Sequence, residues 1–402
     1  MTNVIAPAAE FDLYGPDVIA NPYPTYAALR DLGPLVRVNG TWMVTQYKLA
    51  DQVLKDTNFG RGEYPNLIKS ALGPGPLSES FSNWMQYMDP PNHTRIRSLV
   101  MKAFTPRAVD RLREKMQSAV DALVDAMAAN DHVDFLAEFA YPLPVEVICE
   151  LLGVPNEHHD DFKTWSVDLG RGLQITNLNP EVIKRGNAAA AGFNAYFAEL
   201  IAARRANPAG GFLDDLISAE HEGGRLSDQE LLANVVLLFF GGHETTVNLL
   251  GNGMSVLLSE REAWNEVCSD LSLARDAVAE MLRIDTPVQR ASRIALTDVE
   301  LAGQTIKAGE MVVILIGGAN RDERRYENPE KFDLHRNAPN LSFAAGGHYC
   351  VGATLARIEA EIAVSTLARR LPGMTIDSDQ LEFRPNVILR GLTTLPLRLN
   401  QS

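Results

Sequence analysis

A ten-residue segment near the carboxyl end of the chain places one cysteine in a bend between glycines. Residues 343–352 read Phe-Ala-Ala-Gly-Gly-His-Tyr-Cys-Val-Gly, and a helical pattern begins directly behind them. Glycine permits sharp backbone bends, so amide N–H groups can point at the sulfur of Cys350. The positive end of the following helix favours thiolate over thiol. The fold must therefore present a thiolate in a loop at the start of a helix.

The spacing within this segment identifies a resemblance. An isolated cysteine is more often a small buried residue than a ligand, but Phe-x-x-Gly-x-His-x-Cys-x-Gly fixes five positions of one loop. This pattern resembles the cytochrome P450 family of haem-thiolate monooxygenases, specifically its soluble bacterial members. The resemblance implies Cys350 as the axial iron ligand, with Gly346 in the cofactor-binding loop. It also implies Phe343 packed beside the thiolate and His348 at a haem propionate. In that family, thiolate ligation favours O–O cleavage by the haem.

Bulk properties favour one large domain over residues 1–402. The chain is 46% hydrophobic and has no low-complexity tract, long charge block or internal repeat. Its net charge of −14 disfavours binding to nucleic acid or anionic membranes. The longest strongly apolar run falls short of the roughly 20 residues of a membrane span, and the first residues lack a signal-peptide pattern. Three cysteines without paired spacing argue against disulfides. We expect a cytoplasmic, monomeric protein.

Periodicity predicts a mostly helical chain with a minor β region, which matches the P450-like fold that the resemblance implies. Asn39-Gly40 between apolar runs is a strong hairpin signal. A capping threonine and a following proline predict a helix start at Thr105-Pro106. The remaining expectations are a Gly/Pro/Ser-rich loop at about 60–91, amphipathic helices to about 206, and β-prone runs at 291–317 and 387–397.

The central helix is predicted to begin after a capping box. Ser227 is followed three residues later by Glu230, and the helical pattern runs to about Ser259. Its middle is apolar on every side, which predicts a buried helix. The segment 241–246 reads Gly-Gly-His-Glu-Thr-Thr. Two glycines in a helix interior are unfavourable by about 1 kcal/mol each and are ordinarily explained by close helix packing.

An acid next to an alcohol on this buried helix suggests a second interpretation. Gly241 and Gly242 precede Thr245 by four and three residues, so the gap and the hydroxyl share one face. This arrangement suits proton delivery to reduced dioxygen. By resemblance to the family, the two glycines make room for oxygen, Thr245 hydrogen-bonds the reduced dioxygen, and Glu244 relays protons. His243 is interpreted as a pocket-rim or helix-surface residue, not as a metal ligand.

Three cationic residues are candidates for the haem propionates. His93 and Arg97 lie four residues apart on one helical face, a pattern that alone is more often a solvated basic surface. The family binds propionate with this His-x-x-x-Arg pattern, and Arg293 matches the family's arginine on the strand beside the haem. Charge-assisted hydrogen bonds of this kind contribute about 1.5–3 kcal/mol each. Arg290 matches less well and is expected to face solvent or substrate.

A second charged pair is structural by resemblance. Glu280 and Arg283 lie three residues apart on one side of a helix, and the family uses Glu-x-x-Arg as a buried clamp below the haem. Lys331 stands where the family commonly has the arginine that completes the network. Lysine lacks the planar fork of arginine, so Arg336 is a candidate substitute.

The motifs together imply a b-type haem monooxygenase (EC 1.14 type) that hydroxylates or epoxidises an organic substrate. Electrons are expected from a separate ferredoxin or flavodoxin and its NAD(P)H-dependent reductase, with a candidate basic docking patch at Lys102, Arg107, Arg111 and Arg113. Two alternatives stay open: a peroxygenase that uses H₂O₂ directly, and a non-catalytic haem-binding sensor. The acid–alcohol pair argues against both, because neither needs proton delivery to O₂.

The substrate pocket is predicted by family analogy to be apolar. Such a lining favours a lipophilic substrate such as a terpenoid, steroid, fatty acid or polyketide, although most small-molecule pockets are apolar. The residues proposed to line it are Val236, Leu237, Phe240, Val288, Val387 and Ile388.

Overall fold

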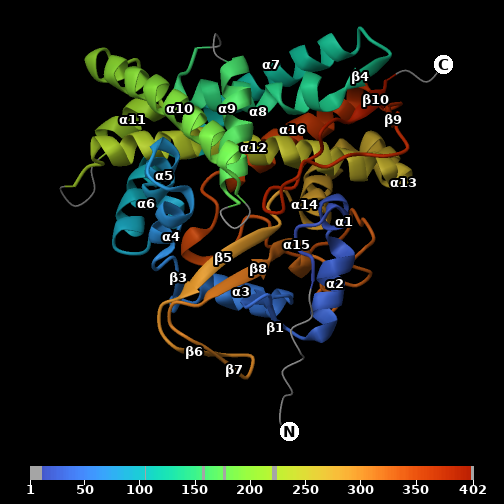
Figure 1. The fold of residues 1–402 in the computed structure, drawn as a ribbon. Helices are drawn as coiled ribbons and strands as arrows, with labels where there is room; N and C mark the ends of the chain where they lie inside the picture. Colours follow the sequence, from blue (N-terminus) through green and yellow to red (C-terminus); the bar gives the residue numbers. More distant parts are fainter. Residues whose placement is uncertain (1–10, 105, 156–158, 175–177, 220–223, 400–402) are drawn as a thin grey trace. The chain divides into compact units, whose positions relative to one another are not determined.

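The hairpin predicted around Asn39 and Gly40 begins a five-stranded sheet in the computed structural model (Figure 1). Both turn residues have left-handed backbone angles, with φ of 49° and 81°, as a two-residue hairpin requires. The strand order is β1-β2-β8-β5-β3, with β2 parallel to β8 and the other pairs antiparallel. These strands are β1 (Leu35–Val38), β2 (Thr41–Val44), β3 (Phe59–Gly60), β5 (Arg290–Ala295) and β8 (Met311–Leu315).

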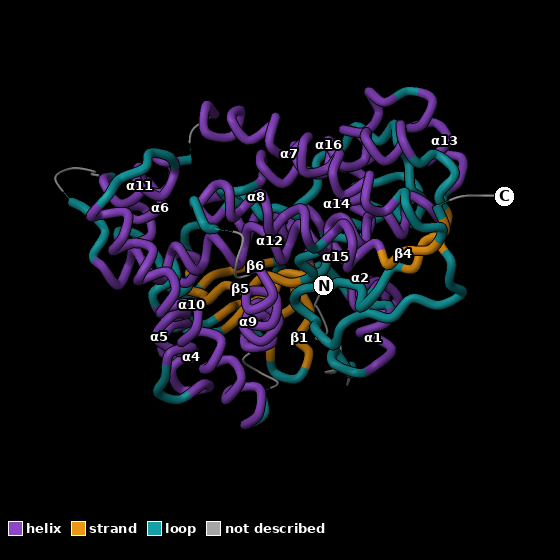
Figure 2. The backbone as a smooth tube through the Cα atoms, turned by 90° about the horizontal axis from the view of Figure 1, so that it is seen from above, coloured by secondary structure: helices purple, strands orange, loops and turns teal. Residues whose placement is uncertain are grey.

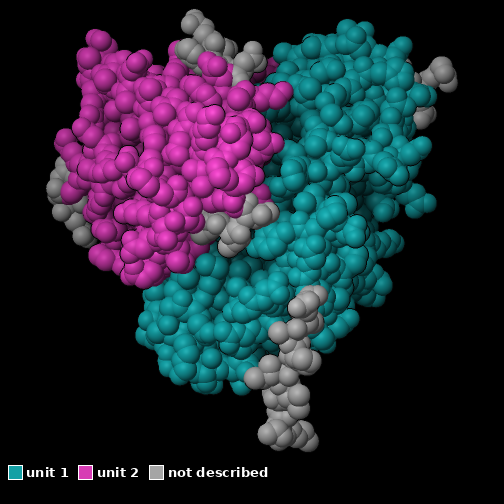
Figure 3. Space-filling model, viewed as in Figure 1, with its two compact units in different colours: residues 1–60, 120–142, 245–402 teal, residues 61–119, 143–244 magenta. Residues whose placement is uncertain are grey.

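The structure describes residues 11–104, 106–155, 159–174, 178–219 and 224–399. They form two compact units (Figure 3). Unit 1 comprises residues 1–60, 120–142 and 245–402, and unit 2 comprises residues 61–119 and 143–244. Neither unit is a continuous stretch of chain. Two long helices, α7 (Pro106–Met127) and α12 (Asp228–Ser259), contribute residues to both units.

Unit 1 contains the sheet, the carboxyl-terminal half of α12 and the helix that follows Cys350. One side of the sheet packs on α3 (Tyr47–Lys55), where Val44, Val53 and Ile314 are fully buried. Its other elements are α1 (Pro16–Ala20), α2 (Tyr23–Leu32), β4 (His132–Asp134), π-helix η2 (Leu136–Ala140), α13 (Arg261–Ser269), η4 (Leu271–Leu273), α14 (Ala274–Ile284), β6 (Val299–Leu301), β7 (Gln304–Ile306), α15 (Ile316–Ala319), η5 (Gly346–His348), α16 (Ala353–Arg370), β9 (Thr375–Ile376) and β10 (Pro396–Arg398).

Unit 2 is helical, and its start differs from the prediction. Residues 60–91 were expected to be a loop, but they include α4 (Tyr64–Leu72), α5 (Pro76–Ser82) and η1 (Met85–Tyr87). Prolines stand in the first turns of α4 and α5, where a missing N–H is tolerated, so they begin helices here. The remaining helices are α6 (Asn92–Ala103), α8 (Pro142–Leu152, of which Pro142 belongs to unit 1), α9 (His159–Gly172), α10 (Pro180–Ala206) and α11 (Phe212–Ser218).

The predicted capping box at the start of α12 is confirmed. Glu230 N–H donates to Ser227 Oγ at 3.2 Å, and Ser227 N–H donates to the Glu230 carboxylate at 2.9 Å. The helix ends at Ser259, as predicted, and residues 235–240 are buried. Helices predominate over strands (Figure 2), which confirms the mostly α fold class.

The carboxyl-terminal segment is less regular than its β-prone composition predicted. Between residues 383 and 395 the structure has only isolated bridges, Val288 with Leu389 and Phe383 with Leu392, before β10 begins. The predicted helix start at Thr105 lies outside the described residues, although α7 does begin at Pro106. Within the described ranges, none of the helices combines the length and the apolar character that crossing a membrane requires.

Candidate active site

The cysteine loop is held in shape by its backbone. Cys350 N–H donates to the Phe343 carbonyl at 3.0 Å, which closes the loop directly before α16. Gly346 has φ of +69°, and a Cβ there would lie 2.5 Å from the carbonyl oxygen of Leu54 on α3. A side chain at Gly346 is thus disfavoured twice, by its conformation and by backbone contact. The loop presents Cys350 on the surface of the protein chain.

Exposure distinguishes Cys350 from the other two cysteines. Burial raises the pKa of the Cys149 thiol to about 12, and burial also raises the pKa of Cys268. Because a metal binds the thiolate form, such shifts disfavour ligation at both positions. Cys350 is the exposed cysteine, and it lies one helical turn from the amino-terminal end of α16.

An arginine that the sequence reading did not single out lies at this loop. The guanidinium carbon of Arg357 is 4.4 Å from the centre of the Phe343 ring, and its Nη1 donates to the Tyr349 hydroxyl at 3.1 Å. These contacts brace two residues of the loop against the first turns of α16. The signal was available in the sequence, since Arg357 follows Cys350 by two turns of the helix.

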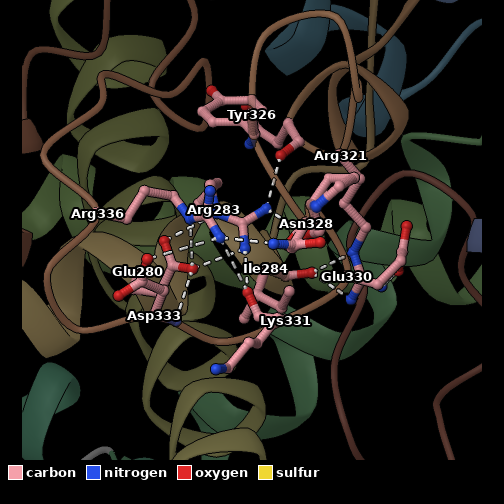
Figure 4. Close-up of polar contacts among 12 residues, drawn as sticks. Glu280, Arg283, Ile284, Arg321, Tyr326, Asn328, Glu330, Lys331, Asp333 and Arg336 are labelled. Atoms are coloured by element: carbon pink, nitrogen blue, oxygen red, sulfur yellow. Dashed lines mark hydrogen bonds and ion pairs between the residues drawn. The ribbon is translucent and has the colours of Figure 1, made fainter.

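The predicted ion pair between Glu280 and Arg283 forms a dense network (Figure 4). Arg283 donates to both carboxylate oxygens of Glu280, at 2.8 and 2.7 Å, in a bidentate geometry. Both side chains are buried, with 1% and 3% exposure. The remaining Arg283 donors reach the carbonyls of Asn320, Pro329 and Lys331. A buried pair satisfied on every side suits a structural role.

Arg336 is the third member of this network. It donates through Nε to Glu280 Oε1 at 3.0 Å and through Nη1 to the Glu327 carbonyl at 2.7 Å. Lys331 contributes only its backbone carbonyl, which accepts from Arg283 and Arg336. The candidate substitution of Arg336 for Lys331 therefore has the predicted geometry.

The two glycines of α12 have different surroundings. A Cβ added to Gly242 would lie 2.7 Å from Ile148 Cδ1, so this glycine permits close packing against α8. A Cβ added to Gly241 would meet nothing within 4 Å. Open space at Gly241 agrees with the predicted gap, whereas packing accounts for Gly242.

The polar residues that follow these glycines are mostly buried. Glu244 in unit 2 is 5% exposed, and Thr245 in unit 1 is half-buried. His243 is fully buried, with Nδ1 2.7 Å from the Phe239 carbonyl and its ring against Phe239. Of the two interpretations of His243, the helix surface is wrong, because the rings of Phe239 and Phe240 lie against this buried side chain, and the pocket rim stays a prediction. Among the residues described, no three His, Cys, Asp or Glu side chains group as a metal site.

The propionate candidates are placed as follows within each unit. His93 and Arg97 lie on α6 of unit 2, four residues apart, with His93 buried and Arg97 half-buried. Arg293 lies on β5 of unit 1 and is 2% exposed. Arg290 does not face solvent: it is buried and donates to the Tyr26 hydroxyl and the Leu13 carbonyl. Its role is to anchor the amino-terminal segment.

The predicted pocket residues fall into two groups. In unit 1, Val288 bridges to Leu389, and Gln289 N–H donates to the Ile388 carbonyl at 2.8 Å, so Val288, Val387 and Ile388 are close together. In unit 2, Phe240 stacks on Trp84 at 5.9 Å between ring centres. Val236 and Leu237 are buried on the same helix.

The donor set fits haem. An exposed thiol on a fixed loop provides an axial ligand, and Arg293 and His93 are buried cationic or hydrogen-bonding side chains of the kind that propionates need. The structure describes two side chains of the candidate docking patch. Lys102 is exposed, and Nε of Arg113 lies 3.8 Å from Oδ1 of Asp110. The side chains of Arg107 and Arg111 lie outside the described residues.

Comparisons with known proteins show what the whole chain is similar to. The family model described as Cytochrome P450 matches residues 35–388. The cytochrome P450 monooxygenase PikC of Streptomyces venezuelae is 37% identical and aligns over 99% of this chain and 95% of its own length. The structure of CalO2 superposes with a TM-score of 0.92 at 36% identity, over 97% of this chain and 99% of CalO2. P450BioI in complex with hexadec-9Z-enoic acid ligated acyl carrier protein gives a TM-score of 0.89 at 32% identity, over 96% and 99%.

Proposed function

This chain belongs to the cytochrome P450 family, a family of haem-thiolate monooxygenases, and from that premise we propose that Cys350 is the axial ligand of its haem iron. The protein is an oxidoreductase that binds iron protoporphyrin IX through a cysteine thiolate and oxygenates organic substrates. When bound, haem supplies the activation of O₂. The observation that supports Cys350 is its exposure on a loop closed by the 3.0 Å bond to Phe343.

The experiment that tests this ligand compares the three cysteines. We expect Cys350→Ser to lose the thiolate signature in the reduced-CO difference spectrum. Cys149→Ser and Cys268→Ser are the matched controls and should keep it, because burial disfavours their thiolates. Loss of the signature in a control, or its retention in Cys350→Ser, would overturn the assignment.

Thr245 and Glu244 are proposed to handle protons. Thr245 offers a hydroxyl one turn after the open position at Gly241, and Glu244 brings a carboxyl to the neighbouring position of α12. The hydroxyl holds a proton at the reacting oxygen, and the carboxyl restores it. Gly241 leaves the space that this arrangement needs.

His93, Arg97, Arg293 and His348 are proposed to bind the two propionates. Their support is chemical: His93 and Arg293 are buried, Arg97 and His348 are half-buried, and propionates need donors of this kind for charge-assisted hydrogen bonds. Phe343 is proposed to pack beside the thiolate. An Arg293→Gln variant should release haem faster than wild type when apomyoglobin is used as acceptor, with Arg37→Gln as an exposed control.

The substrate is proposed to be lipophilic, with Val236, Leu237, Phe240, Val288, Val387 and Ile388 lining its pocket. Redox partners and lipophilic substrates are general properties of this family.

A ferredoxin or flavodoxin with its NAD(P)H-dependent reductase is the proposed electron source, and a cytoplasmic location suits that partner. Turnover with each pair, set against turnover with H₂O₂ alone, tests this choice; a screen for shifts of the haem Soret band, with free and carrier-linked acyl chains included, tests the substrate class.

A further inference from the structure

Two buried amides on α12 each keep one polar atom without a hydrogen-bond partner among the described residues. Asn248 is 2% exposed and Asn252 is fully buried. The atoms concerned are Nδ2 of Asn248, a donor, and Oδ1 of Asn252, an acceptor. Buried polar atoms in proteins are nearly always paired with protein or with ordered water. Both atoms therefore indicate a small polar ligand.

The other polar atom of each side-chain amide is already hydrogen-bonded. That bond identifies which atom of the amide is the oxygen and which is the nitrogen. Arg384 donates through Nη2 to Oδ1 of Asn248. Asn252 donates through Nδ2 to the Arg390 carbonyl at 3.0 Å. Exchanging oxygen and nitrogen in either amide would place two donors or two acceptors together. The unpaired atoms are thus one donor and one acceptor.

Their spacing suits a single bridging water. Asn248 and Asn252 are four residues apart on one face of α12, about 6 Å along the axis. Side chains on successive turns can incline toward each other, so both amide atoms can reach one water through hydrogen bonds of about 2.8 Å. The segment 384–391 folds back on itself, since Arg384 N–H donates to the Gly391 carbonyl at 2.9 Å, and its Gly391 lies against Asn248. A Cβ at Gly391 would collide with Asn248 Oδ1, so only glycine permits this approach.

The amides belong to a longer polar stripe. Thr245 precedes Asn248 by three residues, and Ser255 and Ser259 follow on the same face. Ser255 Oγ donates to the Asn252 carbonyl at 2.8 Å, and Ser259 Oγ donates to the Ser255 carbonyl at 2.8 Å. Ser255 is buried and Ser259 is exposed. Polar groups therefore recur from Thr245 to the solvent over about 21 Å of an otherwise apolar helix.

We propose that Asn248 and Asn252 hold a buried water, and that this water belongs to a file that renews the proton of the Thr245 hydroxyl from solvent. Each water in the file passes one proton to its neighbour and takes one from the next, so the file ends unchanged and solvent supplies the net proton. The file is a second proton source for this hydroxyl beside the Glu244 carboxyl, and Glu244 is not one of its members. The proton role rests on the proposed function of Thr245, whereas the water site does not.

The water site is tested by a crystal structure of the holoprotein at a resolution that shows ordered water. We expect density within about 3 Å of both Asn248 Nδ2 and Asn252 Oδ1. A structure with no such density overturns the proposal. Asn248→Asp keeps the acceptor for Arg384 and should keep the water, which then turns to donate to the new oxygen.

The proton role is tested by the product formed per NAD(P)H consumed and by the solvent isotope effect on product formation. Asn252→Leu, similar in shape but without the acceptor, should lower coupling about fivefold, the factor that one hydrogen bond represents, and raise the isotope effect. Asn248→Leu should have the same effect, and it serves as the test if Asn252→Leu does not fold. Asn248→Asp should resemble wild type. Unchanged coupling and isotope effect in both Leu variants would overturn the file.

A third variant separates this proposal from the function it rests on. If Thr245→Ala leaves coupling unchanged, the assignment of Thr245 fails and the proton file fails with it, while the crystallographic water stands. If Thr245→Ala uncouples turnover but the Leu variants do not, the water is structural only and the proton file is wrong.

Discussion

Arg283 donates a hydrogen bond to the backbone carbonyl of Asn320 at 3.0 Å, and the amide of Asn320 reaches the segment that precedes Cys350. Asn320 Oδ1 accepts from Leu341 N–H at 2.8 Å, and its Nδ2 donates to Ser342 Oγ at 2.9 Å. Asn320 is fully buried. One residue therefore joins the buried ion pair to the residues directly before the cysteine loop.

Asn320→Ala is expected to destabilise the protein and loosen the loop together. The substitution removes both amide bonds and leaves the Leu341 N–H buried without a partner, at a cost of about 2–3 kcal/mol. Urea unfolding measures the stability, and the fraction of protein with a thiolate-type CO spectrum reports the loop. Asn66→Ala, at an exposed position, is the control and should change stability by no more than about 0.5 kcal/mol. If stability falls by about the expected 2–3 kcal/mol while the CO spectrum stays intact, the loop does not depend on Asn320.

Arg336→Ala is expected to cost about 3–5 kcal/mol, because it leaves the buried Glu280 carboxylate with one cationic partner fewer. Three backbone carbonyls, those of Glu327, Asn328 and Lys331, lose a donor as well. Arg336→Lys should recover only part of the loss, since lysine lacks the planar fork. Chemical unfolding of the three proteins gives the ranking.

Lys331→Ala is the matched control for this cluster. Its side chain is exposed and its contribution is a backbone carbonyl, so we expect a change within about 0.5 kcal/mol. Equal losses at 331 and 336 would contradict the geometry in Figure 4.

Local patterns in the sequence predicted local structure well. The spacing of Glu280 and Arg283, the capping box at Ser227 and the hairpin at Asn39-Gly40 each depend on residues within one turn, and all three are confirmed. Arg336 is 56 residues from Glu280, so spacing alone did not identify it; it was named because Lys331 lacks the required donors.

Two predictions were wrong for different reasons. Proline and glycine occur both in loops and at helix ends, and the burial of a side chain depends on tertiary packing that one helix does not show. Proline and glycine in residues 60–91 indicated a loop, yet Pro76 begins a short helix and Gly73, with φ of +70°, ends another. The helix-surface alternative for His243 was wrong because the sequence of one helix does not reveal which side chains cover it. The rings of Phe239 and Phe240 surround that histidine.

Thr245→Ala is expected to keep haem binding but to uncouple electron use from product. Without the hydroxyl, the reacting oxygen loses its proton source, and more of the NAD(P)H consumed ends in peroxide. Positioned acid–base groups typically contribute 10²–10⁴-fold to a rate, so the loss of product per NAD(P)H should be large. NAD(P)H, peroxide and product are measured in one assay. Thr246→Ala is the neighbouring control: Thr246 is 2% exposed and was not assigned as the catalytic alcohol, so its coupling should match wild type. Uncoupling at 246 alone would transfer the assignment to that residue.

Glu359, on the helix that follows Cys350, is expected to make the stability of the protein depend on pH. Its side chain is buried on α16, and its Oε1 has no hydrogen-bond partner among the described residues. Burial raises the pKa of this carboxyl to about 8. The folded protein therefore keeps a proton that the unfolded chain has already released between about pH 4.5 and 8.

The sign follows from that difference in bound protons. Stability from the neutral carboxyl is fully present below the ordinary glutamate pKa and is lost as pH rises through the folded pKa near 8. We expect the free energy of unfolding of wild type, relative to Glu359→Gln, to fall by on the order of 1 kcal/mol per pH unit across this window and to level off on either side. Glutamine has the same shape without the ionisation, so other titrating groups cancel in the comparison. Parallel curves for the two proteins between pH 5 and 8 would show that Glu359 is ionised or reached by water in the folded state.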